Sequence, residues 1–108
     1  ASIVDAISVY PTSYHFTTSG GLKEVATVTC SEAGIPSTFS ASVTFDPEGI
    51  IEELVTTGGN SGDSIWVSVI TNSTYHSACA SATITLTCGD ASCELIIYQD
   101  GYVGECEF

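Results

Sequence analysis

Two histidines, His15 and His76, are the only imidazole side chains in the sequence and the natural candidates for proton transfer near neutral pH. In many hydrolases an imidazole activates a serine or cysteine nucleophile and is itself oriented by an acid. Neither histidine lies in a glycine-bounded nucleophile motif, and serine is so frequent that one near a histidine carries little information. We therefore expect exposed strand or loop positions for both histidines, and no enzymatic activity.

Cysteines and acidic residues are the candidate metal ligands. No Cys-x-x-Cys or paired histidine spacing occurs, and the interval from Cys88 to Cys93 is wider than in a zinc knuckle. Calcium prefers about six to eight oxygen ligands, and no Asp-x-Asp-x-Asp-Gly run supplies them. The acids considered for calcium are Asp46, Glu48, Glu52, Glu53 and Asp63. We expect these carboxylates to be ordinary solvated groups, and we expect no metal and no cofactor.

The cysteine count is odd, so at least one thiol is unpaired or bonded between chains. The five are Cys30, Cys79, Cys88, Cys93 and Cys106. A secreted disulfide scaffold more often has an even count, which favours reduced, partly buried thiols made in a cytoplasm. Cys88 and Cys93 flank Gly89-Asp90-Ala91-Ser92, so they would face each other across a hairpin, close enough to bridge if the geometry permits.

Charge excludes some partners. Lys23 is the only basic side chain, against thirteen carboxylates, and the net charge is −12. Such a chain would repel phosphate backbones and anionic lipids, so we expect neither nucleic acid nor membrane as a partner. A basic partner surface or cations would be favoured, although acids spread along a β-protein also serve solubility. No apolar run approaches the roughly 20 residues of a transmembrane helix.

Short segments of alternating apolar and polar residues, separated by turn residues, must position these groups. Strands are expected at residues 3–10, 14–17, 23–30, 38–45, 50–57, 64–71, 81–88 and 93–99. Pro11 divides the first strand because proline cannot donate to a strand ladder. The pattern predicts an all-β fold, an immunoglobulin-like antiparallel β-sandwich of about 7–8 strands. It would form one domain over residues 1–101, with 102–108 as a C-terminal extension.

Alternation also assigns strand faces. The residues expected to face inwards are Ile65, Val67, Val69, Ala82, Ile84, Leu86, Cys88, Cys93, Leu95 and Ile97. On the outside, apolar and aromatic side chains are candidates for binding a protein or a glycan, since both kinds of interface use such groups. The alternating segment 102–108 could add a strand to a neighbour's sheet edge. The candidate binding residues are Trp66 and Ile70 on one outer face, Ile96 and Tyr98 on another, and Tyr102 and Phe108 in the C-terminal segment.

Two segments carry a family resemblance. Residues 7–21 run as a short strand into a proline, then a second strand, and stop at Gly20-Gly21. Residues 81–101 form a closing hairpin that ends in Gln99-Asp100-Gly101. Together they resemble the BACON family, immunoglobulin-like domains of gut Bacteroidetes and their phages. Family members commonly have tryptophans in the two central strands, where this chain has Phe39 and Phe45.

The resemblance implies two functions without defining ligand-contacting residues. Related domains occur on phage virions, so we expect a non-enzymatic auxiliary (decoration) protein on a capsid of a phage of gut Bacteroidetes. Its partner would be the major capsid protein or another virion protein, with weak adhesion to glycans or mucin. It would be assembled in the host cytoplasm and displayed on the virion exterior. The alternative is a secreted or cell-surface carbohydrate- or mucin-binding module of a gut bacterium, which the family's association with carbohydrate-active enzymes implies.

Overall fold

A computed structural model describes residues 4–107, which form ten strands and no helix. The strands are β1 (Ala6–Tyr10), β2 (Ser13–Phe16), β3 (Gly21–Glu32), β4 (Ile35–Pro36), β5 (Thr38–Phe45), β6 (Ile51–Leu54), β7 (Gly58–Asn60), β8 (Ser64–Val69), β9 (Ala80–Cys88) and β10 (Ala91–Gln99). Each of the eight predicted strands is present, and β4 and β7 are additional short ones. Since no helix occurs among residues 4–107, none there could span a membrane.

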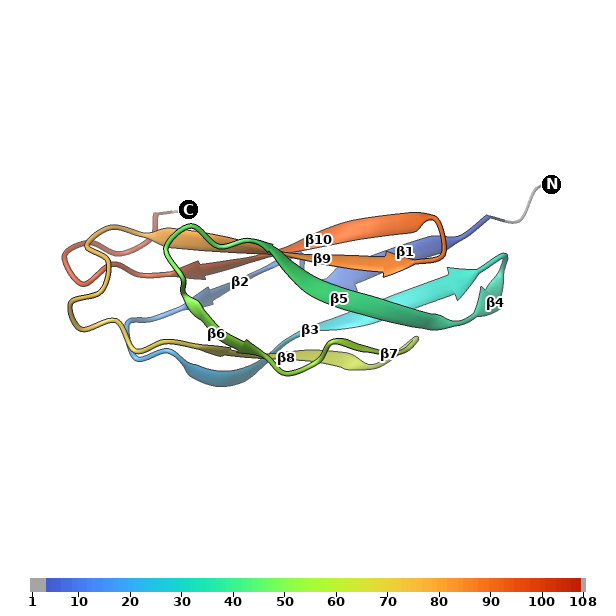
Figure 1. Ribbon diagram of the computed structural model, residues 1–108, viewed down its shortest axis with the longest axis horizontal. Helices are drawn as coiled ribbons and strands as arrows, with labels where there is room; N and C mark the ends of the chain where they lie inside the picture. The colour runs from blue at the N-terminus through green and yellow to red at the C-terminus, as the bar shows by residue number, and fades with distance from the viewer. Residues whose placement is uncertain (1–3, 108) are drawn as a thin grey trace.

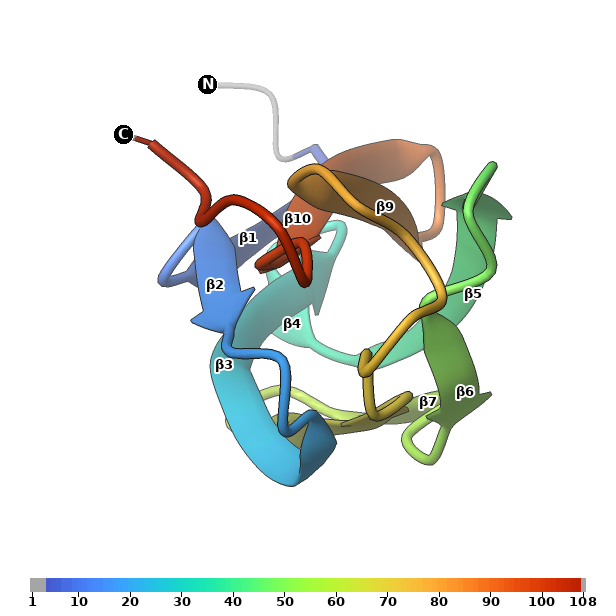
Figure 2. The same ribbon diagram turned by 90° about the vertical axis from the view of Figure 1, so that its left-hand side faces the viewer.

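The strands form two packed sheets (Figures 1 and 2). One sheet has the order β1-β3-β8-β6, with β4 also paired to β3, and the other has the order β2-β10-β9-β5-β7. Every pair is antiparallel except β2 with β10, which is parallel. This division of strands between two sheets is that of an immunoglobulin-like β-sandwich. The predicted fold class is therefore confirmed.

The divided first strand joins the two sheets. Tyr10 and Pro11 are linked by a cis peptide bond, and Pro11 has no N–H for a ladder, so pairing is interrupted at this point. Before the break β1 pairs with β3, and after it β2 pairs with β10. The interruption predicted at Pro11 is thus a change of sheet.

The core lies between the sheets and follows the predicted alternation on β8, β9 and β10. On each strand every second side chain points inwards. Removing one large apolar side chain from water in this way stabilises the fold by about 1.5–3 kcal/mol. The largest apolar side chains with almost no exposure are Ile50, Ile65, Ile84, Leu86, Leu95 and Ile97. Cys88 is also buried, and Cys93 is half-buried against the same core.

Strand β5 departs from simple alternation. Phe39 and Ala41 are buried, and a strict period of two would place Val43 and Phe45 with them. A β-bulge between Val43 and Phe45 shifts the register against β9, so that Phe45 pairs with Thr83 on the outer face. Phe45 is consequently 54% exposed. The bulge therefore places the ring of Phe45 on the outer face of this sheet.

Candidate functional site

Two rows of side chains cross the outer face of the sheet that contains β9. In the first row the strand register aligns Phe45, Thr83, Ile96 and Ser13, on β5, β9, β10 and β2. In the second row it aligns Ser81, Tyr98 and His15. We call this surface the β9 face; its residues are Ser13, His15, Phe45, Ser81, Thr83, Thr85, Glu94, Ile96 and Tyr98.

The β9 face combines hydroxyl groups with aromatic and aliphatic groups. Thr85 shares a 2.7 Å hydrogen bond with the hydroxyl of Thr44 on the neighbouring strand, which fixes the spacing of two hydroxyls. Serine and threonine hydroxyls both donate and accept hydrogen bonds, and the rings of Phe45 and Tyr98 add apolar area. Lys23, the only basic residue of the chain, belongs to β3 in the other sheet. The face can therefore bind a partner through rings and hydroxyls, without a lysine or arginine side chain.

The predicted binding residues do not form one surface. Ile96 and Tyr98 lie on the β9 face as predicted, both half-buried, while Trp66 is 41% exposed on β8 in the other sheet. Ile70 does not join Trp66 on the outside: it is half-buried and packs against the core, just beyond the end of β8. Tyr102 is exposed at one end of the sandwich. Phe108 lies outside the described residues.

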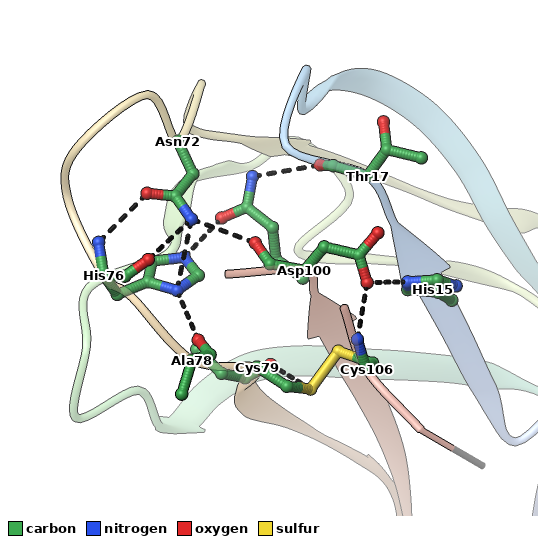
Figure 3. Close-up of a disulfide and its surroundings, with 10 residues drawn as sticks. His15, Thr17, Asn72, His76, Ala78, Cys79, Asp100 and Cys106 are labelled. Carbon is green, nitrogen blue, oxygen red and sulfur yellow. Dashed lines mark hydrogen bonds and ion pairs between the residues drawn. A yellow bond between two sulfur atoms is a disulfide. The ribbon is translucent and has the colours of Figure 1, made fainter. Parts of the chain in front are cut away.

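A disulfide closes the end of the sandwich that carries Tyr102 (Figure 3). It joins Cys79, just before β9, to Cys106, so the expectation of reduced thiols is wrong for this pair. Cys88 and Cys93 are both free, which corrects the suggested bridge across the last hairpin. The strand register explains why: Cys88 pairs with Ala91 and Cys93 with Leu86, so the two thiols are not opposite each other.

The C-terminal segment is bonded to its own domain. Tyr102 N–H donates to the carbonyl of His76 at 3.1 Å, and Val103 N–H donates to the carbonyl of Ser77 at 3.1 Å. Gly101 makes this approach feasible, since a Cβ there would lie 2.0 Å from the carbonyl oxygen of Ser77. Residues 102–107 form no strand and fold back on the loop before β9. The addition of a strand to a neighbour's sheet edge stays a prediction for this segment.

A buried polar network lies next to the disulfide (Figure 3). Asn72 donates to the carbonyls of His76 and Asp100 at 2.9 Å each, and it accepts from the backbone N–H of His76 at 3.0 Å. Gln99 Nε2 donates to the carbonyls of Thr17 (3.3 Å) and Ile70 (2.6 Å), while its Oε1 lies 2.9 Å from His76 Nε2. His76 is buried, so the prediction that it is exposed is wrong. It lies inside the loop as a structural group.

The same contacts bear on the candidate metal ligands. His15, Asp100 and Cys106 place ligand-type atoms within 4.8 Å of one another, but the sulfur of Cys106 is engaged in the disulfide and is no thiolate ligand. Of the acids considered for calcium, Asp46 accepts from the backbone N–H of Ile50 and Asp63 from that of Asn60. These carboxylates organise separate turns.

Asp5 connects the first strand to two hairpins at the other end of the sandwich. Its carboxylate accepts the N–H groups of Asp90 and Ala33, each at 2.8 Å. These two backbone hydrogen bonds, first that from Asp90 and then that from Ala33, hold the pKa of Asp5 below its ordinary value, because they favour the charged form.

Asp100 has a similar role at the disulfide end. Its Oδ1 accepts the N–H of Cys106 at 2.8 Å and lies 2.6 Å from His15 Nε2. The bond from Cys106 is the main reason why the pKa of Asp100 is lowered; burial opposes the shift, and the bond to His15 adds to it.

We predict that the protein loses stability in acid through these two carboxylates. Because the pKa values of Asp5 and Asp100 are lowered on folding, their contribution is complete above the unfolded carboxyl value of about 3.9 and disappears as the pH falls through the folded values. Urea unfolding at about pH 7 and about pH 3 measures the loss. The double variant Asp5→Asn, Asp100→Asn should depend less on pH over that range, and an unchanged dependence would contradict the assignment.

Phe45 and the pair Cys79–Cys106 were not identified by the sequence analysis. A strict alternation places Phe45 inside, and no signal in the sequence marks the bulge that turns it outwards. The disulfide depends on the C-terminal segment folding back on the loop before β9. One signal was available: Gly101 follows Gln99-Asp100 and allows a close backbone approach.

Comparison with known proteins adds fold information. No family model matches the chain, and a search of curated proteins finds no match. A solved structure, the Bacteroides ovatus GH5 xyloglucanase in complex with a XXXG heptasaccharide, is similar with a TM-score of 0.65 and 17% sequence identity. The match covers 90% of this chain and 19% of the xyloglucanase chain. At this identity the similarity shows a shared fold alone, and this chain spans about a fifth of that enzyme.

Proposed function

We propose that this protein is a non-enzymatic interaction protein, an auxiliary (decoration) protein on the capsid exterior of a phage of gut Bacteroidetes. The observation that carries the proposal is the β9 face, where the rings of Phe45 and Tyr98 and the side chain of Ile96 lie among hydroxyls. The BACON-like opening and closing strands support the phage assignment by resemblance.

The composition of the β9 face suits a protein partner. Protein interfaces are enriched in aromatic side chains and have few charges at their centre. Along the row from Phe45 through Thr83 and Ile96 to Ser13 there is no charged side chain. Elsewhere the domain is acidic, with a net charge of −12. The matching surface on the major capsid protein would therefore be apolar at its centre and basic at its margin, since opposite charges guide association.

The first test is whether the protein is part of the particle. Mass spectrometry of gradient-purified phage particles from a host culture, with copies counted against the major capsid protein, should find it at a fixed stoichiometry. Recovery in the cell envelope or the medium, with none on particles, would contradict the virion assignment.

The second test concerns the face that binds. We predict that Phe45→Ser combined with Tyr98→Ser weakens binding to capsids stripped of the protein by about 30-fold or more, equivalent to about 2 kcal/mol for loss of interface anchors. Co-sedimentation across a concentration series measures the change. Trp66→Ser is the matched control, because Trp66 is an exposed ring on the other sheet. Equal weakening by both variants would show that the β9 face is not the specific surface.

A secreted carbohydrate- or mucin-binding module is the second candidate. It is favoured by the Cys79–Cys106 disulfide, because disulfides form and persist mainly in oxidising compartments outside the cytoplasm. Hydroxyls flanked by the rings of Phe45 and Tyr98 would also suit a sugar ligand. A glycan array followed by affinity electrophoresis on mucin separates the two candidates. Binding that the Phe45→Ser, Tyr98→Ser variant abolishes would support the module, and an empty array would reject it.

A further inference from the structure

Three thiols remain outside the disulfide: Cys30, Cys88 and Cys93. Cys30 belongs to β3 in one sheet and Cys88 to β9 in the other, and they are 3% and 2% exposed. Both side chains belong to the core cluster between the sheets. A bond between them would therefore cross the core and connect the two layers of the sandwich.

The two buried cysteines enter the core from strands of opposite sheets, and these strands, β3 and β9, contact each other across the sandwich. The Cys30 thiol donates a hydrogen bond to the carbonyl oxygen of Ser37 at 3.1 Å. Burial is the main reason why the pKa of Cys88 is raised, and the neighbouring side chain of Cys30 raises it further. Cys30 and Cys88 are therefore neighbours in the folded protein.

Cys93 does not compete for this contact. It lies on β10, beside Leu86, in the same sheet as Cys88. It is half-buried, and burial alone raises its pKa. The residue that pairs with Cys88 across the last hairpin is Ala91. Cys30 is therefore the better partner for Cys88.

We propose that Cys30 and Cys88 form a second disulfide, across the core, under the oxidising conditions in which Cys79–Cys106 forms. Oxidised glutathione, or another small disulfide, is the oxidant. The Cys88 thiolate attacks this disulfide and releases one glutathione thiolate, leaving Cys88 in a mixed disulfide. The Cys30 thiolate then attacks the Cys88 sulfur and releases the second glutathione. The two cysteines lose two protons and two electrons, and the oxidant is reduced to two thiols.

The second bond would complement the first in position. Cys79 precedes β9 and Cys88 ends it, nine residues later, so the two bonds would lie roughly 30 Å apart along the strand. One would close the C-terminal end of the sandwich, and the other would hold the two sheets together at the opposite end. Cys93 would remain as the one odd thiol.

The test uses the unmodified chain, refolded from the reduced, denatured state in a buffer of oxidised and reduced glutathione. Free thiols are then alkylated, and the protein is digested with a protease that cleaves after aspartate and glutamate. This places Cys30 in peptide 25–32, Cys93 in 91–94 and Cys106 in 106–107, with Cys79 and Cys88 together in 64–90.

The expected product links peptide 25–32 to peptide 64–90, with 106–107 attached through Cys79 and with Cys93 alkylated. Fragment spectra should place the link to 25–32 at Cys88. The Cys93→Ser variant should give the same product, whereas Cys30→Ser should leave Cys88 alkylated or bound to glutathione. Alkylated Cys30 and Cys88 beside a formed Cys79–Cys106 bond would overturn the proposal. So would a link between 64–90 and 91–94.

Discussion

Replacing Gln99 with leucine is expected to lower the free energy of unfolding by about 3–5 kcal/mol, although the two side chains are similar in size. Gln99 is fully buried and has three hydrogen-bond partners, the carbonyls of Thr17 and Ile70 and the imidazole of His76. Leucine would remove the partner of the Ile70 carbonyl and of His76 Nε2, while the Thr17 carbonyl would keep only the N–H of Gly20. Each unsatisfied buried group costs about 1–3 kcal/mol, which exceeds the gain from added apolar area.

Equilibrium urea unfolding measures this loss. Thr87→Ala is the control, because Thr87 is an exposed residue of the adjacent strand β9 and such a change should stay within about 0.5 kcal/mol of the wild type. If the free energy of unfolding of Gln99→Leu lies within about 1 kcal/mol of the wild-type value, the hydrogen bonds of Gln99 do not stabilise this end of the sandwich as proposed.

Removing the Cys79–Cys106 disulfide is expected to cost about 3–4 kcal/mol of stability. The cysteines are 27 residues apart in sequence, and closing a loop of that length removes this much chain entropy from the unfolded state. Locally, residues 102–107 would then depend on a few backbone hydrogen bonds to the loop before β9 and on the bond from Cys106 to Asp100. We expect this segment to detach before the sandwich unfolds.

Two measurements on the Cys79→Ser, Cys106→Ser variant separate these effects. Urea unfolding reports the global loss, and limited digestion with chymotrypsin reports cleavage after Tyr102, which should become much faster than in the oxidised wild type. Cys93→Ser, which removes a free thiol, is the control. If the cleavage rate after Tyr102 is the same with and without the disulfide, the segment is held by its other contacts.

Much of the fold is predictable from sequence because half-buried strands alternate with period two. Residues 64–69, 80–88 and 91–99 each show this alternation, and the predicted inner faces match the buried ones. The alternation fails on β5, because a bulge depends on the partner strand as well as on the sequence of the bulged one. Phe45 therefore turns outwards while Phe39 stays inside.

The candidate site was also only partly predictable, because it depends on contacts between segments that are distant in the sequence. Alternation placed Trp66 on one outer face and Ile96 with Tyr98 on another, and the structure has them on different sheets. It also placed Ile70 outside, beside Trp66, whereas Ile70 packs against the core. The burial of His76 and the bond between Cys79 and Cys106 depend on loops that meet at one end of the molecule. Such contacts between distant segments leave no periodic signal in the sequence.

The sheet change at Pro11 has a mechanical consequence. Strand β1 begins and the C-terminal segment ends toward opposite ends of a molecule 52 Å long (Figure 1), so tension between the termini would act along the strands. The four parallel residue pairs between β2 and β10 would then be sheared together, since none can open ahead of the rest. The Cys79–Cys106 bond meanwhile keeps residues 80–105 from being drawn out. The resistance of this domain to a pulling force would therefore depend on how fast β2 separates from β10 under that force. It would not depend on the free energy of unfolding at equilibrium.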